Sequence, residues 1–164
     1  PATRAHLADE RPDCAVIDAP GDGYVADLRY AMDAIDGGNA GDAALLTVAA
    51  DLPLLDVEAV NAVIDAAGAA GDDGADDSPA SLTVCVPAAR KRDLGVSVDA
   101  ATEMDGREVV PAGINVVGGG GGSDGDDAAV HLTEDARLAV NVNYPSDVRV
   151  AERLLADGDL THGV

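Results

Sequence analysis

Three groups of residues could bind a ligand or a metal ion, and each lies in a polar segment that follows an apolar one. In the segment 18–23, Gly21 and Gly23 stand just before a predicted helix, where free backbone N–H groups can hold an anion such as a phosphate. Glycine in such a turn also serves backbone conformation alone, and the pattern fits both uses. Asp51 directly follows the most apolar segment, where a carboxylate can hold Mg²⁺ against nucleotide phosphates. An aspartate that only forms the following turn explains this pattern equally well.

Asn141 and Asn143 form the third candidate group. They alternate with two valines, so an extended backbone would turn both amides to one face. Such amides bind a nucleotide or a metal, or they tie down the turn that Tyr144 begins, which is their commoner use. The basic run 90–92 is expected to be a solvated loop, with an acidic substrate as the alternative. The sequence contains no P-loop, no complete dinucleotide-binding fingerprint and no serine–histidine–aspartate signature.

Apolar periodicity predicts the elements that would position these residues. Helices are predicted over residues 3–11, over 24–35, after a cap at Asp56 with Val57, Val60, Val63 and Ile64 as apolar positions, and over 148–155. Strands are predicted over residues 14–17, 43–50, 81–87, 96–98, 109–117 and 138–142. The acidic, glycine-rich segments 71–81 and 118–127 are expected to be loops.

The order of these elements predicts the fold class. Strands alternate with helices up to residue 86, which is typical of a single α/β domain. We expect a three-layer α/β/α sandwich with a mostly parallel, Rossmann-like sheet. The strand 43–50 is apolar on both faces, as a central strand would be. Ligands of such sheets bind beyond the carboxyl ends of the strands, and the three candidate groups all lie at such positions.

Acidic charge is spread along the whole chain. The 164 residues include 25 Asp, 6 Glu, 9 Arg and a single Lys, which gives a formal net charge of −21. Short carboxylates with almost no lysine suit a halophilic protein in very high salt, where self-repulsion is screened. An acidic patch for a basic partner is the less favoured alternative. Nucleic-acid binding through a basic face is excluded.

The remaining composition limits the class of protein further. Hydrophobic residues make up 47% of the chain, enough for a core, although Phe and Trp are absent. Cys14 and Cys85 each lie in an apolar run and are expected to be buried thiols rather than a disulfide or a metal site. No apolar run approaches the roughly 18 residues that cross a membrane, and no signal peptide is visible, so a cytoplasmic location is expected.

Four segments share a pattern with a known enzyme family. They are 16–28 (VIDAPGDGYVADL), 50–54 (ADLPL), 110–117 (VPAGINVV) and 139–148 (AVNVNYPSDV). Taken together and in this order, they resemble the archaeal adenosylcobinamide-phosphate guanylyltransferases, of the superfamily that includes the molybdenum-cofactor guanylyltransferases. The third segment is the most specific, whereas the second and fourth are shared across the wider nucleotidyltransferase superfamily.

The resemblance implies a fold of the nucleotide-diphospho-sugar-transferase type and a role for each matching residue. Asp51 would be the catalytic residue, holding the Mg²⁺ that bridges the nucleotide phosphates. The other implied positions are Asp18, Gly21, Gly23 and Tyr24 along the guanosine, Asn141 and Asn143 near the metal and the transferred phosphate, and Pro111, Ala112, Gly113 and Asn115 on the acceptor side.

The implied reaction transfers GMP from GTP to adenosylcobinamide phosphate and releases pyrophosphate, in cobalamin biosynthesis and salvage. An acceptor phosphate oxygen attacks the α-phosphorus in line, so positioning and electrostatics do the work rather than a protein nucleophile. The implied partners are GTP and a corrinoid phosphate, with no nucleic acid and no membrane span, and a homodimer stays open.

One part of the family pattern has no match in this sequence. The family begins with a strand and a glycine-rich loop of the form Ala-Gly-Gly-x-Gly-Thr-Arg, and this sequence starts where the family's second helix would lie. The resemblance therefore predicts a single domain over residues 1–164 that lacks the first strands, with activity dependent on the missing loop. Two other hypotheses stay open: a related nucleotidyltransferase with molybdopterin or a sugar or lipid phosphate as acceptor, and a non-catalytic nucleotide-binding remnant.

Overall fold

The computed structural model describes residues 2–36, 44–71, 81–118 and 128–158. The chain divides into two compact units, Pro1–Gly41 and Asp42–Val164, and each is described by itself. Most of the segments 71–81 and 118–127, which were expected to be loops, lies outside the described residues. None of the described helices is both long enough and apolar enough to cross a membrane.

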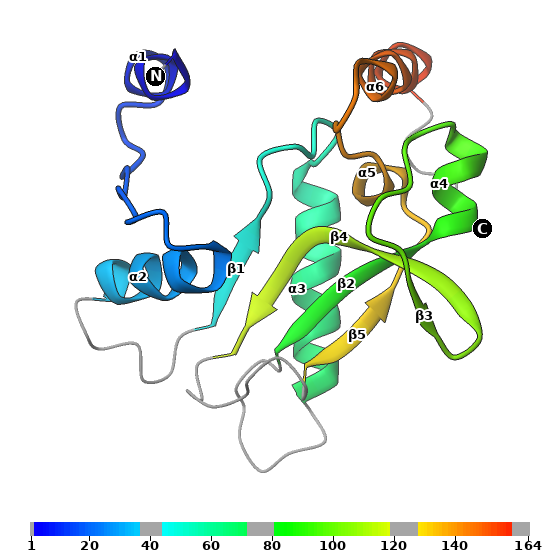
Figure 1. Cartoon of the computed structure of the whole chain (residues 1–164), viewed down its shortest axis with the longest axis horizontal. Coiled ribbons are helices and arrows are strands. Elements are labelled where there is room, and N and C mark those ends of the chain that lie inside the picture. The colour runs from blue at the N-terminus through cyan, green and yellow to red at the C-terminus, as the bar shows by residue number, and fades with distance from the viewer. Residues whose placement is uncertain (1, 37–43, 72–80, 119–127, 159–164) are drawn as a thin grey trace. The chain divides into compact units, whose positions relative to one another are not determined.

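The first unit consists of two helices joined by an irregular segment (Figure 1). Helix α1 (Ala2–Glu10) and helix α2 (Tyr24–Asp36) confirm both helices predicted here. The predicted strand 14–17 is wrong, because its residues have no strand geometry and Cys14 and Val16 are exposed. The described part of this unit contains no second strand, so a short extended segment has no backbone partner that would hold it as a strand. The expected burial of Cys14 fails for the same reason.

The second unit is a mixed sheet with helices packed around it (Figure 1). Its strands are β1 (Leu45–Val48), β2 (Leu82–Pro87), β3 (Thr102–Met104), β4 (Arg107–Val117) and β5 (Ala129–Leu132). Its helices are α3 (Val57–Gly71), α4 (Ala88–Leu94), α5 (Ala136–Ala139) and α6 (Pro145–Asp157). The predictions of strands at 81–87 and 109–117 and of the helices after Asp56 and over 148–155 are confirmed.

The sheet is mostly antiparallel, which corrects the expected mostly parallel, Rossmann-like sheet. Its strands follow the order β1–β4–β2–β5, and β3 pairs with β4. Strand β4 is antiparallel to β1, β2 and β3, and only β2 and β5 pair in parallel. The chain reverses direction in the β3–β4 hairpin, and β4 lies between β1 and β2. Since β1 and β2 are both antiparallel to β4, they run in the same direction, and β5 runs with them.

Strand β1 lies at an edge of the described sheet and not at its centre. It pairs with β4 alone, and three of its four residues are only half-buried. The predicted segment 43–50 is therefore a strand for four residues, Leu45–Val48. Apolar side chains on both faces suggested a central strand, but the position of a strand in a sheet depends on its pairing partners, which periodicity does not specify.

Two further predicted strands are replaced by other elements. In the segment 96–98, the backbone N–H of Val96 donates to Lys91 O at 3.0 Å as part of the end of α4, so it is not available to a sheet. The segment 138–142 begins inside α5, which Asp135 caps by accepting from Arg137 N at 2.8 Å. The last strand is instead β5, earlier in the chain.

Helix α3 covers one face of the sheet with small side chains. Its buried positions are Ala59, Val63 and Ala67, four residues apart, whereas Val57 is 73% exposed. The alanines let the helix axis approach the sheet closely, where they join Val84 and the other buried residues of the main core. Asp56 caps this helix as expected, accepting from Ala59 N at 2.9 Å. The third layer of the expected sandwich is not confirmed in the described part of this unit.

A buried arginine joins α3 to α5. Arg137 is 8% exposed and its guanidinium bonds to Asp135 at 2.7 Å, Asp56 at 3.0 Å and Glu58 at 3.1 Å. Its hydrogen bond to Asp135 is the main reason that the pKa of Arg137 is raised above its ordinary value. The N-terminal ends of both helices are therefore fixed by one cation.

We predict that Arg137→Met lowers the free energy of unfolding by about 2 kcal/mol, because it leaves three carboxylates facing one another without a cation. Arg92→Met is the matched control, since Arg92 and Glu108 form an exposed pair with half of each side chain in water, and it should cost less than about 1 kcal/mol. Urea unfolding of both variants in molar KCl makes the measurement. Equal losses would contradict a special role for Arg137.

Candidate functional site

The candidate site lies at the edge of the sheet where three strands end. Strands β1, β2 and β5 run in the same direction, so their carboxyl ends share one edge. Asp51 follows β1, Lys91 lies on α4 directly after β2, and Asn141 follows α5, which comes after β5. The strand directions explain why side chains as much as 90 residues apart in sequence meet here.

Asp51 and Asn141 are held together by their backbones and side chains. The N–H of Val142 donates to Asp51 O at 2.9 Å, and Asn141 Nδ2 lies 3.5 Å from Asp51 Oδ2. Both side chains are half-buried. This long hydrogen bond is the only one recorded for the Asp51 carboxylate within the described ranges, so its oxygens keep the capacity to bind a cation.

Lys91 is a site residue that sequence reasoning missed. The run 90–92 was expected to be a solvated loop, but it lies in α4, and Lys91 is only 3% exposed. Its ammonium donates to Ala139 O at 2.9 Å and to Asn141 Oδ1. Burial lowers the pKa of Lys91, while the carboxylates of Asp147, Asp51 and Asp99 act in the opposite direction.

A sequence signal for this lysine does exist. Lys91 lies three residues after Ala88, which is also buried, so both share the inner face of α4. Arg92 lies on the outside, where it pairs with Glu108 at 2.7 Å. Lys91 is also the single lysine of a chain whose other basic residues are arginines and histidines.

Asp147 is a fully buried carboxylate that joins two loops beside the site. It accepts four hydrogen bonds: from Ser97 N and Oγ at 2.9 Å, from Asn143 N at 3.1 Å and from Tyr144 N at 2.9 Å. Burial by itself would raise the pKa of Asp147, but these hydrogen bonds outweigh it and the pKa lies below the ordinary value. The ionised carboxylate therefore stabilises the folded state.

The two asparagines predicted to share one face contact different carboxylates. Asn141 faces Asp51, whereas Asn143 Nδ2 lies 3.4 Å from Asp99 Oδ2. The Tyr144 hydroxyl lies 3.5 Å from the other Asp99 oxygen. Asn143, Tyr144 and Asp99 are exposed, so they form a polar rim beside the half-buried Asp51–Asn141 pair.

Of the residues expected on the acceptor side, Gly113 is the one that contacts Ala49, in the segment between β1 and Asp51. Ala49 N donates to Gly113 O at 2.7 Å, two residues before Asp51. Gly113 has a φ of +82° and lies in a bulge of β4, where three residues of β4 face one residue of β2. A Cβ on Gly113 would lie 3.0 Å from Ala49 Cβ.

The other three expected acceptor residues are placed differently. Ala112 is buried in the main core, and Pro111 is exposed opposite Cys85. Asn115 is half-buried and lies in a cross-strand row between Thr47 and Thr83.

The glycine-rich turn expected to hold the nucleotide belongs to the first unit. Gly21 and Gly23 have φ values of +86° and +109°, and Tyr24 is exposed at the start of α2. Asp27 Oδ1 accepts from Gly21 N at 2.8 Å and from Asp22 N at 3.3 Å. A phosphate would have to displace this carboxylate to reach those amides. Asp18 pairs with Arg4.

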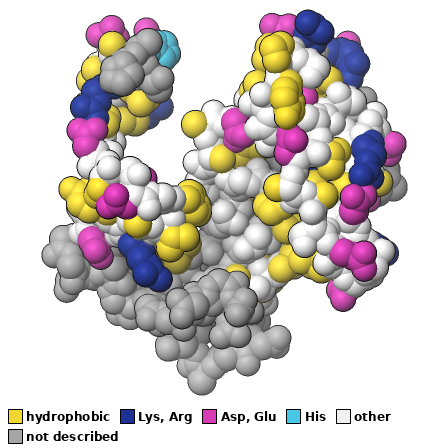
Figure 2. Space-filling model, in the orientation of Figure 1, with side chains coloured by type: hydrophobic (Ala, Val, Ile, Leu, Met, Phe, Trp, Pro, Cys, Tyr) yellow, Lys and Arg dark blue, Asp and Glu magenta, His cyan; other side chains and the backbone are white. Residues whose placement is uncertain are grey.

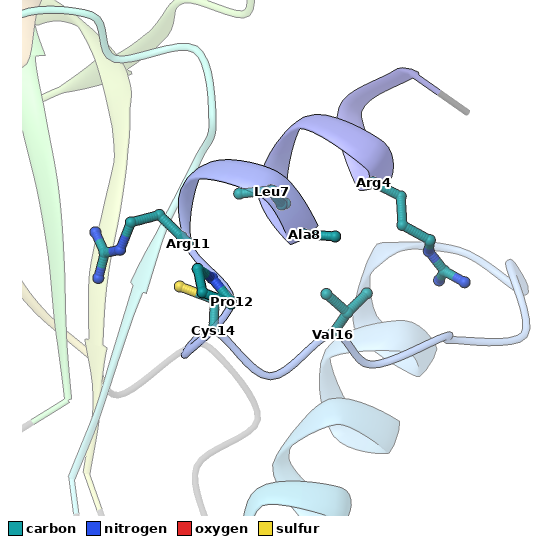
Figure 3. A pocket seen from close by; sticks show the side chains of 7 residues that line it. All are labelled: Arg4, Leu7, Ala8, Arg11, Pro12, Cys14 and Val16. Atoms are coloured by element: carbon teal, nitrogen blue, oxygen red, sulfur yellow. The ribbon is translucent and has the colours of Figure 1, made fainter.

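The first unit also contains a pocket of about 400 Å³ between α1 and the segment after it (Figure 3). Its lining residues are Arg4, Leu7, Ala8, Arg11, Pro12, Cys14 and Val16. In Figure 3, Leu7, Ala8 and Val16 face the hollow, while the Arg11 guanidinium points away from it. The lining contains no carboxylate, so it offers no side-chain ligand of the kind that a hard cation prefers.

The described residues contain no cluster of three or more His, Cys, Asp or Glu side chains that could hold a metal ion. Figure 2 shows acidic side chains spread over several elements of the second unit rather than gathered in one patch. The Asp51 carboxylate fits the way Mg²⁺ is held in phosphate-transferring sites, through one or two carboxylates together with waters and substrate phosphates.

Comparison with protein-family models gives no match, and no curated protein matches the chain.

We predict that Asp147→Asn lowers the free energy of unfolding by about 2 kcal/mol at pH 7, because an amide nitrogen would face backbone N–H donors. The folded-state pKa of Asp147 lies below the unfolded value of about 3.9, so the stabilisation is complete above about pH 4 and is lost as pH falls through the folded-state pKa. Urea unfolding at pH 7, 5 and 3 should show the wild-type advantage shrink at pH 3. An advantage that does not change between pH 7 and 3 would contradict the assignment.

We predict that Gly113→Ala destabilises the protein by about 2–3 kcal/mol, through left-handed strain together with the contact on Ala49. Gly106→Ala is the control, because Gly106 has a similar φ of +75° and open space at its Cβ position, and it should cost about 1 kcal/mol. Urea unfolding compares the two variants. If both lose the same free energy, the close approach to Ala49 contributes nothing.

Proposed function

We propose that this chain is a nucleotidyltransferase of the archaeal adenosylcobinamide-phosphate guanylyltransferase type, transferring GMP from GTP to a corrinoid phosphate. The observation that carries the proposal is the pairing of Asp51 with Asn141 and Val142 across 90 residues of sequence. Two of the four family-like segments thus meet at the edge of the sheet where strands of one direction end.

In this proposal each polar group at the edge has a separate task. The Asp51 carboxylate would hold Mg²⁺, which offsets negative charge on the departing pyrophosphate. Asn141 would direct an N–H group toward the reacting phosphates, and Gly113 would keep the backbone before Asp51 in place. An acceptor phosphate oxygen forms the new bond to the α-phosphorus of GTP, and the bond to the bridging oxygen of pyrophosphate breaks. No residue has to act as a nucleophile, because positioning and electrostatics supply the catalysis.

The direction of the strands supports the fold expected for such enzymes. Strands β1, β2 and β5 run in one direction, as in a doubly wound sheet, and β4 runs against them. We propose that the second unit is one part of a three-layer, Rossmann-like sandwich of the nucleotide-diphospho-sugar-transferase type, in which β4 is an inserted antiparallel strand.

The experiment is calorimetric titration of the chain with GTP, with and without Mg²⁺, in molar KCl. We expect binding that depends on Mg²⁺, and we expect Asp51→Asn to weaken it by about tenfold or more. Asp105→Asn is the matched control: it makes the same charge change in an exposed turn and should bind as the wild type does.

The outcomes separate the parts of the proposal. Absence of Mg²⁺-dependent GTP binding by the wild type would overturn the nucleotidyltransferase assignment for this chain. Equal binding by Asp51→Asn and Asp105→Asn would overturn the role of Asp51. Because the resemblance predicts that activity depends on a glycine-rich loop, pyrophosphate release is measured on the chain joined to such a loop. Comparing adenosylcobinamide phosphate with molybdopterin and sugar phosphates then identifies the acceptor.

A further inference from the structure

The single lysine of the chain is buried where an exposed charge was expected. Lys91 is 3% exposed, and its ammonium donates to the carbonyl of Ala139 and to Asn141 Oδ1. A buried ammonium is costly unless its hydrogen bonds are satisfied, so these two acceptors are what keep Lys91 in place. Its position on α4 puts it at the same sheet edge as Asp51.

The chemistry of the three groups fixes the orientation of the Asn141 amide. A lysine ammonium has only donors, so it can face only the oxygen of the carboxamide. A carboxylate such as that of Asp51 has only acceptors, so it can face only the NH₂ group. Lys91, Asn141 and Asp51 therefore form a directed chain in which Oδ1 accepts from Lys91 and Nδ2 points to Asp51, 3.5 Å from Oδ2.

We propose that Lys91 is a positioning residue that makes Asn141 a hydrogen-bond donor of the site and prevents Asn141 from acting as a metal ligand. Lys91 occupies one of the two Oδ1 lone pairs, and a metal ion on the other would lie beside the ammonium, whose positive charge repels it. The Nδ2 group is instead directed to the half-buried space beside Asp51, where it can donate to the oxygen of an anionic ligand such as a phosphate. The identity of that anion rests on the proposed function, whereas the orientation of the amide does not.

The neighbouring charges agree with this role. Asp147, Asp51 and Asp99 are the carboxylates that act on Lys91, so its ammonium offsets negative charge at a place where a phosphate would add more. Arg90 and Arg92 on the same helix are turned elsewhere: Arg90 donates to Glu134 O at 2.9 Å, and Arg92 pairs with Glu108. Lys91 contacts the site through its hydrogen bond to Asn141 Oδ1.

The first test is nuclear magnetic resonance of the chain labelled with ¹⁵N-asparagine, which needs no ligand. The Asn141 side-chain signal is identified by its loss in Asn141→Ala. We expect Lys91→Met to move this signal toward those of exposed asparagines and to speed its hydrogen exchange about tenfold, while Lys91→Arg, which keeps the donors, restores the wild-type signal in large part. Arg92→Met is the control and should leave it unchanged. An unchanged Asn141 signal in folded Lys91→Met would overturn the proposal.

The second test is Mg²⁺–GTP titration of Asn141→Asp, which stays informative even if Lys91→Met does not fold. This variant keeps an acceptor for Lys91, removes the donor that faces Asp51 and adds a negative charge beside it. We expect it to fold and to bind Mg²⁺–GTP about tenfold more weakly than the wild type. A metal ligand at this position would give the opposite result, since a carboxylate binds Mg²⁺ more strongly than an amide, and equal or tighter binding would overturn the proposal. If the wild type itself does not bind Mg²⁺–GTP, the proposed function fails and the amide signal decides the role of Lys91.

Discussion

The pairing of β4 along both of its edges is the constraint on which the second unit depends. Strand β4 is hydrogen-bonded to β2 on one edge and to β1 and β3 on the other, and it supplies Ile114 and Val116 to the core against α3. Because it runs against β1 and β2, these two strands point the same way and end at the same edge. In its bulge, Gly113 O accepts a hydrogen bond from Ala49 N, two residues before Asp51.

Buried charge is sparse in this acidic chain, and it is found where loops and helix ends must be held. The buried charged side chains among the described residues are Lys91, Arg137 and Asp147. Each has several partners of complementary type, so none carries the full cost of leaving water. Arg137 fixes the ends of two helices, Asp147 joins two loops, and Lys91 contacts the amide next to Asp51. These contacts order the edge of the sheet where the polar residues gather.

Sequence patterns predicted those parts of the fold that depend on local periodicity. Both helices of the first unit, the capped helix α3, and strands β2 and β4 were found where the patterns placed them. Periodicity was less informative about which face is buried: in α3 the small residues Ala59 and Ala67 pack inward while the larger Val57 is exposed. Asp51 and Asn141 were expected at the same edge of the sheet because both follow apolar segments. That expectation assumed a mostly parallel sheet, whereas here only β1, β2 and β5 run in one direction and β4 runs against them.

Residue types at near positions in the chain were enough to predict helices α1, α2, α3 and α6, strands β2 and β4, the acidic surface and the polar segments that carry the candidate site. They were not enough for the segments 14–17, 96–98 and 138–142, which were predicted as strands and are not. The tertiary structure decided the order and direction of the strands, the helical state of α5 and the burial of Lys91. These features depend on hydrogen bonds between residues far apart in sequence, such as Lys91 with Ala139 and Asn141. An ammonium is stable inside a protein only where such acceptors converge, and no local pattern records where distant carbonyl and amide oxygens will lie.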